Sequence, residues 1–485
     1  MWYFPENSRG IGTATDPFHK TAETAPAGQA DYCTYVELYG KYFDASAPVD
    51  EQSFITTYRI YLGANNKADF NLLRNHAYTV NVTLRGKNEV DMRVESVLKP
   101  ANCYMVSEPS TEYTFNATIM GNGCFTPYYE GSGENAPAIV PSRLSPDDAM
   151  LVWETGAAGD VIEPGSVKLS ADRKFISFRT SAAIGGNAVI AAKQNGDIIW
   201  SWHIWSTEYD PETSYDTYVT QTIDNASYNS LPSREIRMMK VNLGATSLTS
   251  TPGDINCYGL YYQWGRKDPF VGAKALTGTE SKAFGNLTAP TTNYSGYDWK
   301  LYKLPTNFTS DDAIVYAVGL PTYFISAIST DWMPLKRSNL WGNPNETAKM
   351  PNMDQGSKSI YDPCPAGWRV PPSDTWTMFT SSGIKVSSAA DINADGWNYG
   401  YNFYCGGWGV GNTAYYPAAG YRKGTGTVIG QLVLDSGDYW SSSAYSKQNQ
   451  YACSLMFRSG NVNPLYSGMD VFRINGRTVR CAREE

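Results

Sequence analysis

Short stretches in which apolar and polar residues alternate recur along this chain of 485 residues, and they restrict its fold more than any other feature. Residues 78–84 read Tyr-Thr-Val-Asn-Val-Thr-Leu, and residues 198–204 place Trp200 and Trp202 on the same face as two isoleucines. A period of two residues is typical of β-strands with one buried face. Gly (43) and Tyr (35) are abundant, as expected for strands joined by tight turns. The sequence therefore predicts a mainly β fold.

The length of the chain indicates about three domains, because a single hydrophobic core rarely serves so many residues. We predict a β-sandwich at residues 1–97 and a second β-sandwich at residues 98–213. Residues 214–485 are predicted to form a loop-rich α+β domain, since they carry much Gly and few runs of helical period. Within this domain Ser373 follows two prolines and is expected to cap a helix, with Asp374 in its first turn.

The charge of the chain argues against two classes of partner. Its formal net charge is −8, and no run of Lys or Arg interrupts the acidic balance. Nucleic acid and anionic membrane surfaces bind basic patches, so neither is expected as a main partner.

Histidine is scarce, and its distribution restricts the chemistry available to the C-terminal half. The chain has three histidines, His19, His76 and His203, and residues 204–485 contain none. A histidine base or metal ligand is therefore excluded there. The motifs of serine hydrolases, zinc proteases and phosphate-binding loops are also missing from the sequence. We predict that the protein is not an enzyme and uses no cofactor.

The C-terminal part carries several motifs in a characteristic order. They are NLGATS (242–247), YGLYYQWGRKDPF (258–270), YDPCPAGWRVPPSDTW (361–376), YYPAAGYR (415–422), YWSSSAY (439–445) and GRTVRCARE (476–484). Together they resemble the Fibrobacter succinogenes major paralogous domain, which has a C-type-lectin-like fold. That family usually begins with Met-Asp-Arg-Asn-Leu-Gly, whereas this chain has Lys240 and Val241 in the second and third positions.

Two further resemblances concern the N-terminal half. Residues 57–86 resemble the closing strands of fimbrillin-like domains of Bacteroidetes pilus and surface proteins. Residues 101–123 followed by residues 186–205 resemble a sandwich module that often follows such domains. The resemblance implies a cell-surface, often adhesive protein without catalytic residues.

The lectin-like resemblance implies a disulfide between Cys364 and Cys481, because such folds commonly join a helix start to the last strand. Two buried free thiols are the alternative. A related fold, that of formylglycine-generating enzymes, uses paired reactive cysteines, for which Cys405 and Cys453 are the candidates. No Lys, Arg or His flanks either residue to lower its pKa, so we favour a structural role for both.

The stretch DINADG (391–396) matches the first half of a calcium-binding loop and makes Asp391, Asn393 and Asp395 candidate metal ligands. The twelfth position of that template falls on Asn402, which cannot supply the usual bidentate carboxylate. The same residue types also form ordinary turns next to glycine, and that is the alternative.

Aromatic residues are concentrated in residues 396–422. Exposed Trp and Tyr side chains stack on sugar rings or anchor protein partners. We therefore name Trp408, Tyr421 and Arg422 as candidate ligand-binding residues and expect them to be exposed. Packing of long loops by aromatic side chains is the alternative.

From these resemblances we expect a cell-surface adhesion protein, a terminal subunit of an outer-membrane-associated fimbria. Its lectin-like domain would bind a host or microbial glycan or protein. Other pilin subunits would join by strand addition to the N-terminal domain, which resembles only the latter half of a fimbrillin-like sandwich. The alternative is a surface lipoprotein that binds polysaccharide outside a pilus.

Overall fold

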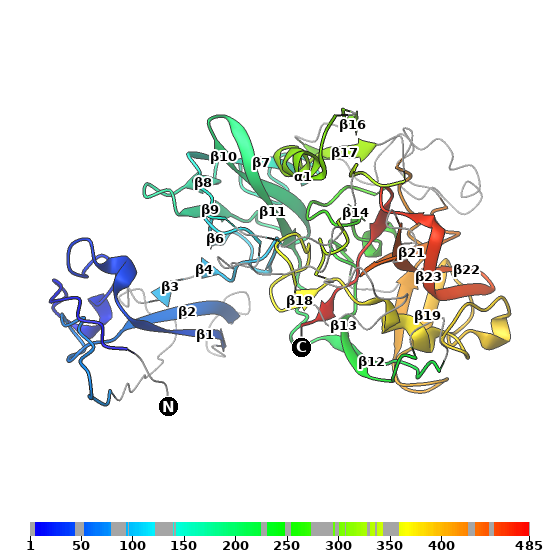
Figure 1. The fold of residues 1–485 in the computed structure, drawn as a ribbon, viewed down its shortest axis with the longest axis horizontal. Helices are drawn as coiled ribbons and strands as arrows, with labels where there is room; N and C mark the ends of the chain where they lie inside the picture. The colour runs from blue at the N-terminus through cyan, green and yellow to red at the C-terminus, as the bar shows by residue number, and fades with distance from the viewer. Residues whose placement is uncertain are drawn as a thin grey trace. The chain divides into compact units, whose positions relative to one another are not determined.

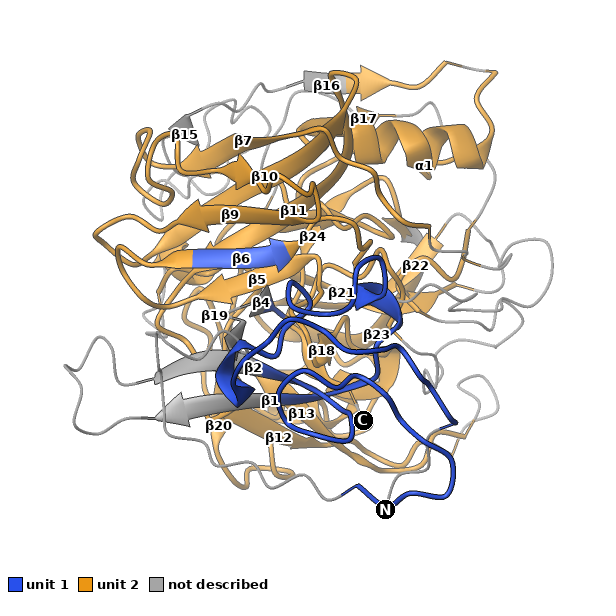
Figure 2. Cartoon of the chain, turned by 90° about the vertical axis from the view of Figure 1, so that its left-hand side faces the viewer, with its two compact units in different colours: residues 1–98, 113–115 blue, residues 99–112, 116–485 orange. Residues whose placement is uncertain are grey.

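The computed structural model forms two compact units, which Figure 2 colours separately. One unit contains residues 1–98 with 113–115, and the other contains residues 99–112 with 116–485. The structure describes residues 5–43, 53–78, 94–95, 97–121, 139, 142–224, 230–247, 254–272, 294–295, 300–305, 307–326, 330–334, 337–342, 358–424, 432–445 and 451–484. The domain boundary expected between residues 213 and 214 therefore falls inside the second unit.

The first unit is built on a three-stranded sheet with the order β1-β2-β3. Its strands are β1 (Tyr35–Phe43), β2 (Ser53–Tyr61) and β3 (Val94–Glu95). β1 and β2 are antiparallel. Beside them lie the short 3-10 helices η1 (Pro17–His19) and η2 (Ala30–Tyr32), and β4 (Val97–Leu98) pairs with part of β6 (Glu112–Asn116). Most of the strand predicted at residues 78–84 lies outside the described residues.

The second unit contains a five-stranded sheet with the order β15-β7-β10-β11-β5. Its strands are β5 (Cys103–Val106), β7 (Asp148–Thr155), β10 (Gly186–Gln194), β11 (Asp197–Ser206) and β15 (Tyr294–Ser295). β8 (Lys168–Leu169) and β9 (Phe175–Arg179) pair antiparallel in another sheet, where β9 lies between β8 and β6. β15 comes from the segment predicted to be a separate domain, so the two segments share a sheet.

Strand β11 is buried on both faces, whereas its sequence pattern predicts one buried face. Trp200 and Trp202 are buried on one face, and Ser201, His203 and Trp205 are buried on the other. The helix α1 (Ser310–Gly319) packs against β11, as Figure 1 shows. A distant segment therefore covers the face that the local pattern leaves to solvent.

Further sheets of the second unit have four, five or two strands. One sheet has the order β12-β13-β25-β18, and it contains β12 (Tyr215–Val219), β13 (Glu235–Met239), β18 (Trp368–Arg369) and β25 (Ala482–Arg483). Another has the order β14-β24-β21-β22-β23, and it contains β14 (Tyr261–Gln263), β21 (Gly437–Ala444), β22 (Tyr451–Arg458), β23 (Asn461–Phe472) and β24 (Gly476–Thr478). Two-stranded pairs are β16 (Lys300–Lys303) with β17 (Tyr323–Ser326), and β19 (Gly400–Tyr404) with β20 (Thr413–Pro417). The prediction of a mainly β protein is confirmed.

One hydrophobic core runs through the second unit. It contains Trp153 of β7 and Trp205 of β11 together with Trp264, Trp440 and Val479 of the C-terminal segment. Burial of apolar surface stabilises a fold by about 25 cal/mol per Å². The segments on both sides of residue 213 therefore stabilise each other through shared burial.

Arg473, Arg477 and Arg480 are fully buried in the C-terminal segment. The Arg480 guanidinium lies 3.8 Å from the centre of the Tyr416 ring and donates a hydrogen bond of 3.0 Å to Asn242 Oδ1. Arg477 pairs with Asp438. These ring contacts, hydrogen bonds and ion pairs offset part of the free-energy cost of burying the guanidinium groups.

The helix expected at Ser373 is the 3-10 helix η7 (Ser373–Phe379), and its start differs from the prediction. Pro372 occupies the cap position, and no side chain caps the helix. Asp374 instead forms two hydrogen bonds of 2.8 Å with the guanidinium of Arg234, which arrives from just before β13. Two more short helices in the described part of the chain are η5 (Ile255–Cys257) and η8 (Ala389–Asp391). No helix in the described part of the chain has the length and apolar character required to span a bilayer.

Candidate functional site

The hairpin of β19 and β20 carries the strongest candidate site. Its strands pair from Gly400 with Pro417 to Tyr404 with Thr413, and residues 405–412 form the connecting loop. Within the loop, Cys405 N donates to Asn412 O at 2.9 Å and so closes its base. We call residues 405–412 the hairpin tip. Gly409 has a φ of +63°, a conformation that glycine adopts without strain.

A buried asparagine from a neighbouring segment holds the hairpin tip in place. Asn393 is 2% exposed, and its Nδ2 donates to Gly407 O and to Met378 O, both at 2.9 Å. Its Oδ1 accepts a hydrogen bond of 2.7 Å from Gly409 N. The backbone on both sides of Trp408 is therefore fixed by one side chain.

The fixed tip presents two apolar side chains to solvent. Trp408 is 49% exposed and Val410 is 61% exposed. By contrast, Trp376 and Trp440 are fully buried. Residues 405–413 include no ionisable side chain other than the Cys405 thiol. The tip can therefore bind through apolar and stacking contacts rather than through charge.

The other two candidate ligand residues lie apart from the tip, near Gly476. Tyr421 is half-buried, and the guanidinium of Arg477 lies 5.5 Å from the centre of its ring. The expectation that Arg422 is exposed is wrong, because it is only 4% exposed. Its guanidinium lies 3.8 Å from the centre of the Phe324 ring, and its backbone pairs with Gly476. Packing against aromatic rings takes up the flat face that a ligand would need.

The three candidate calcium ligands have separate roles in the structure. Asp391 Oδ1 accepts a hydrogen bond from Ser381 Oγ at 2.9 Å, and Asp395 Oδ1 accepts one from Tyr404 Oη at 3.0 Å. All three polar contacts of the Asn393 side chain go to backbone groups of the protein. Among the described residues no group of His, Cys, Asp or Glu side chains is arranged to hold a metal ion. The structure therefore assigns Asn393 to bracing the tip and not to a calcium loop.

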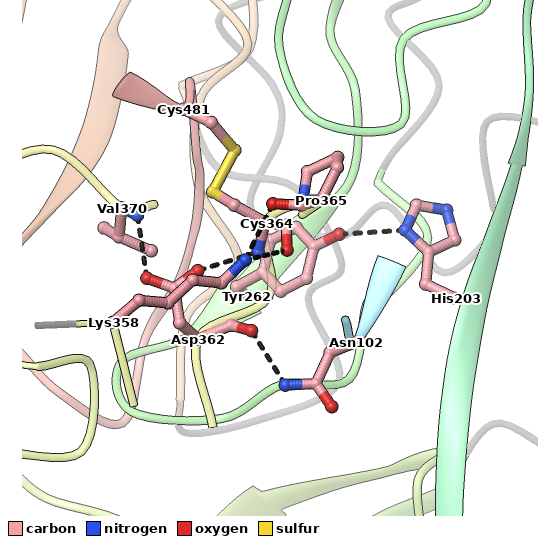
Figure 3. Close-up of a disulfide and its surroundings, with 9 residues drawn as sticks. All are labelled: Asn102, His203, Tyr262, Lys358, Asp362, Cys364, Pro365, Val370 and Cys481. Carbon is pink, nitrogen blue, oxygen red and sulfur yellow. Dashed lines mark hydrogen bonds between the residues drawn. A yellow bond between two sulfur atoms is a disulfide. The ribbon is translucent and has the colours of Figure 1, made fainter. Parts of the chain in front are cut away.

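Cys364 and Cys481 are joined by a disulfide, as Figure 3 shows, which is the bond that the resemblance implies. Asp362 positions the Cys364 segment, since its Oδ1 accepts from Cys364 N and its Oδ2 accepts from Val370 N, both at 2.8 Å. The buried Lys358 donates to the carbonyl oxygens of Cys364 and Pro365, both at 2.7 Å. Burial lowers the pKa of Lys358 and raises the pKa of Asp362 to about 6. These contacts indicate a structural role for the segment, which the disulfide joins to Cys481.

Cys405 and Cys453, the candidates for a reactive pair, are both buried. Burial raises the pKa of Cys405 to about 12 and raises that of Cys453 well above its ordinary value. A thiol nucleophile needs a lowered pKa and access to substrate. The environment of both thiols therefore disfavours the reactive-cysteine alternative.

Reasoning from the sequence missed the bracing role of Asn393 and the exposure of Val410. Asn393 and Gly409 are 16 residues apart, and they meet because the segment around Asn393 pairs with β19, which in turn pairs with β20. The alternation of glycine with Trp408 and Val410 was the one available signal, because glycines on both sides of a large side chain leave it uncovered.

Fold and site together define a class: a mainly β protein with a braced, exposed aromatic hairpin. Comparison with known families then places the N-terminal part. Residues 2–82 match a family described as a domain of unknown function, DUF4906. Neither the curated proteins nor the solved structures provided a match.

Proposed function

We propose that the protein is a cell-surface adhesin, a terminal subunit of an outer-membrane-associated fimbria. Its C-terminal part binds a glycan or protein of a host or neighbouring microbe through Trp408. The observation that carries the proposal is the exposure of Trp408 on a tip held by a buried side chain.

The physical argument concerns the cost of binding. A flexible loop loses conformational entropy when a partner orders it, whereas the hairpin tip is already ordered by Asn393. An exposed Trp supplies a large apolar face with only two rotatable side-chain bonds, so it is a frequent anchor of binding surfaces. The tip therefore combines a low ordering cost with a large contact area.

The fimbrial part of the proposal rests on the N-terminal unit. The match at residues 2–82 is to a family associated with Bacteroidetes fimbrillins, and it overlaps the segment that resembles a fimbrillin-like domain. In the described part of this unit, β1 pairs with β2 on one side and forms an edge of the sheet. An edge strand can accept a strand from another pilin subunit by backbone hydrogen bonding.

The segment that follows Cys481 is held within the second unit. Strand β25 lies between β13 and β18 in its own sheet, and the disulfide with Cys364 joins it to the same unit. This segment is therefore engaged within the subunit and is not available for donation to a neighbour. Such a subunit would receive a strand without supplying this one.

Substitution of the tip residue tests adhesion directly. Trp408→Ala should abolish binding of the full chain to host or bacterial cells while its melting temperature stays close to that of the native protein, because Trp408 is about half exposed. Tyr215→Ala is the matched control, since Tyr215 is an exposed aromatic residue on β12. Equal binding by both variants would refute the role of the tip.

Electron microscopy with gold-labelled antibody tests the position in the fimbria. Label at filament ends supports a terminal subunit, and uniform label along the shaft refutes it. Label spread over the cell surface without filaments would favour the alternative of a surface lipoprotein that binds polysaccharide.

A further inference from the structure

The second unit contains a groove of about 570 Å³ that lies apart from the Trp408 tip in the sequence. One wall comes from the end of β7, the loop that follows it and the start of β10, and it includes Thr155, Asp160 and Gly186. The other wall comes from residues 244–260. The volume lies within the range of about 300 to 1,000 Å³ that small-ligand sites occupy.

A buried side chain ties the two walls of the groove together. Asn187 is 3% exposed, and its Nδ2 donates a hydrogen bond of 2.9 Å to Gly244 O on the opposite wall. Its Oδ1 lies 2.9 Å from His203 Nε2, so both ends of the Asn187 carboxamide have a partner within the protein. Burial lowers the pKa of His203 to about 3, which leaves the ring neutral at ordinary pH. The groove is therefore a built feature with a fixed width.

The lining of the groove excludes an anionic ligand. Among the described lining residues Asp160 is the one with a charged side chain, and none of them is Lys, Arg or His. Phosphate, sulfate and carboxylate groups are recognised by cationic side chains or by converging backbone N–H groups. Phosphorylated, sulfated and sialylated molecules therefore do not fit this lining.

The polar side chains of the two walls can form hydrogen bonds with the hydroxyl groups of a ligand. Asp160 Oδ2 accepts from Ala157 N at 2.7 Å, and its other oxygen has no hydrogen-bond partner among the described residues. Thr155 Oγ1 accepts from Asn187 N at 2.9 Å, which leaves the hydroxyl hydrogen available for donation. Asn256 adds a carboxamide on the opposite wall. One hydrogen of its Nδ2 is donated to Asp254 Oδ1 at 2.9 Å, which leaves the second hydrogen for a ligand. An acceptor and donors on facing walls match the hydroxyl groups around a sugar ring.

The apolar part of the lining suits the other face of a sugar. Ile255 lines the groove and is partly exposed, while the neighbouring lining residues Leu260 and Val271 are almost fully buried. A pyranose ring presents C–H groups on its faces and hydroxyls at its edge, so mixed polar and apolar linings are complementary to it. The groove offers both kinds of surface.

A peptide strand fits the groove less well than a sugar does. Strand addition needs free backbone N–H groups in a row. Here Gly185 N donates to Ser206 Oγ at 3.1 Å, and Asn187 N donates to Thr155 Oγ1. The backbone at this wall is therefore occupied by side chains of the protein.

We propose that this groove is a second ligand site, which binds a neutral, hydroxyl-rich oligosaccharide without a metal ion. It is independent of the Trp408 tip, so a partner of the tip and a saccharide in the groove can bind the same subunit.

The test uses the full chain and an array of unbranched glucose, galactose and mannose oligomers together with their sulfated counterparts. Thr246→Trp places a large side chain on an exposed lining position and should weaken binding of a neutral oligomer by about tenfold or more. Asp160→Asn, which retains an acceptor for Ala157 N, should weaken it to a smaller extent. Thr217→Trp on the exposed side of β12 is the matched control and should bind as the native chain does.

Trp408→Ala should leave saccharide binding in the groove unchanged, which separates this proposal from the function of the tip. The proposal is overturned if no neutral oligomer binds, if only sulfated oligomers bind, or if Thr246→Trp and Thr217→Trp bind equally well. It is equally overturned if Trp408→Ala abolishes the binding of the neutral oligomer, since the tip would then hold the sugar.

Discussion

Asn393 and Gly409 are joined by a hydrogen bond of 2.7 Å from the backbone N–H of Gly409 to the side-chain oxygen of Asn393. Because Asn393 also donates to Gly407 O, one buried carboxamide holds both backbone segments next to Trp408. The bond links the segment that reads as a calcium loop to the segment that reads as a ligand site.

Replacement of Asn393 should therefore loosen the tip and destabilise the fold. We expect Asn393→Ala to lower the free energy of unfolding by about 1 to 3 kcal/mol, since it leaves buried backbone groups without partners. Asn393→Asp keeps the shape but loses both N–H donations, and we expect a similar loss. Urea denaturation measures both, with Asn398→Ala at an exposed position as control. A calcium-dependent gain in the stability of Asn393→Asp would contradict the bracing role.

Removal of the disulfide should cost stability mainly by freeing the unfolded chain. Cys364 and Cys481 are 117 residues apart, and closing a loop of this size is worth about 4 to 5 kcal/mol in the chain-entropy model. We expect Cys364→Ala with Cys481→Ala to lose stability of this order, measured by urea denaturation without reductant. Reductant should destabilise the native chain and leave the double variant unchanged. Peptide mapping that found both thiols alkylated in the oxidised protein would contradict the bond.

His203 should make the stability of the second unit depend on pH. Burial lowers its pKa from 6.5 to about 3, so the unfolded chain binds a proton between these values and the folded chain does not. Stability is therefore fully present above pH about 6.5 and is lost as the pH falls toward 3. At pH about 4.5 the loss should be about 2 to 3 kcal/mol for this residue alone.

Comparison with His203→Gln isolates this contribution. The drop in unfolding free energy between neutral pH and pH about 4.5 should be smaller in the variant by that amount. Equal drops in the two proteins would show that His203 is not held neutral by burial. The absolute stability of the variant does not affect the comparison, because only the change with pH is used.

Arg480 should not tolerate replacement by lysine. Its planar group lies 3.8 Å from the Tyr416 ring centre and also bonds Asn242 Oδ1 and Tyr415 O. Lysine cannot reproduce a planar group that stacks and donates in two directions. We expect Arg480→Lys to lose about 2 to 4 kcal/mol in urea denaturation. Arg458→Lys at an exposed position should cost little, and equal losses in the two variants would contradict this account.

Some parts of the fold could be predicted from the local sequence pattern, because they depend on the chemistry of neighbouring residues. The alternation at residues 198–204 indicates a strand, and the structure has β11 there. The start of η7 did not follow, although Ser373 has the residue type of a cap. Arg234 arrives from a distant segment and binds Asp374, and this tertiary ion pair replaces the expected capping arrangement.

The candidate site likewise has some features that the sequence predicts and others that depend on tertiary contacts. Trp408 lies among glycines, so its exposure could be expected from neighbouring residues alone. Arg422 carries a charge and was expected at the surface, yet Phe324 from another strand covers its guanidinium. The groove could not be predicted, because Asn187 and Gly244 are brought together only by the folded chain.

The sequence by itself determined the mainly β class, the lack of histidine chemistry after residue 203 and the residue types of the hairpin tip. Only the tertiary structure decided that residues 116–485 share one unit, that both faces of β11 are buried and that Asn393 holds the backbone on both sides of Trp408. The physical reason is that periodicity and turn chemistry act over a few residues. Burial depends on which distant segment covers a given face, and no local pattern contains that information.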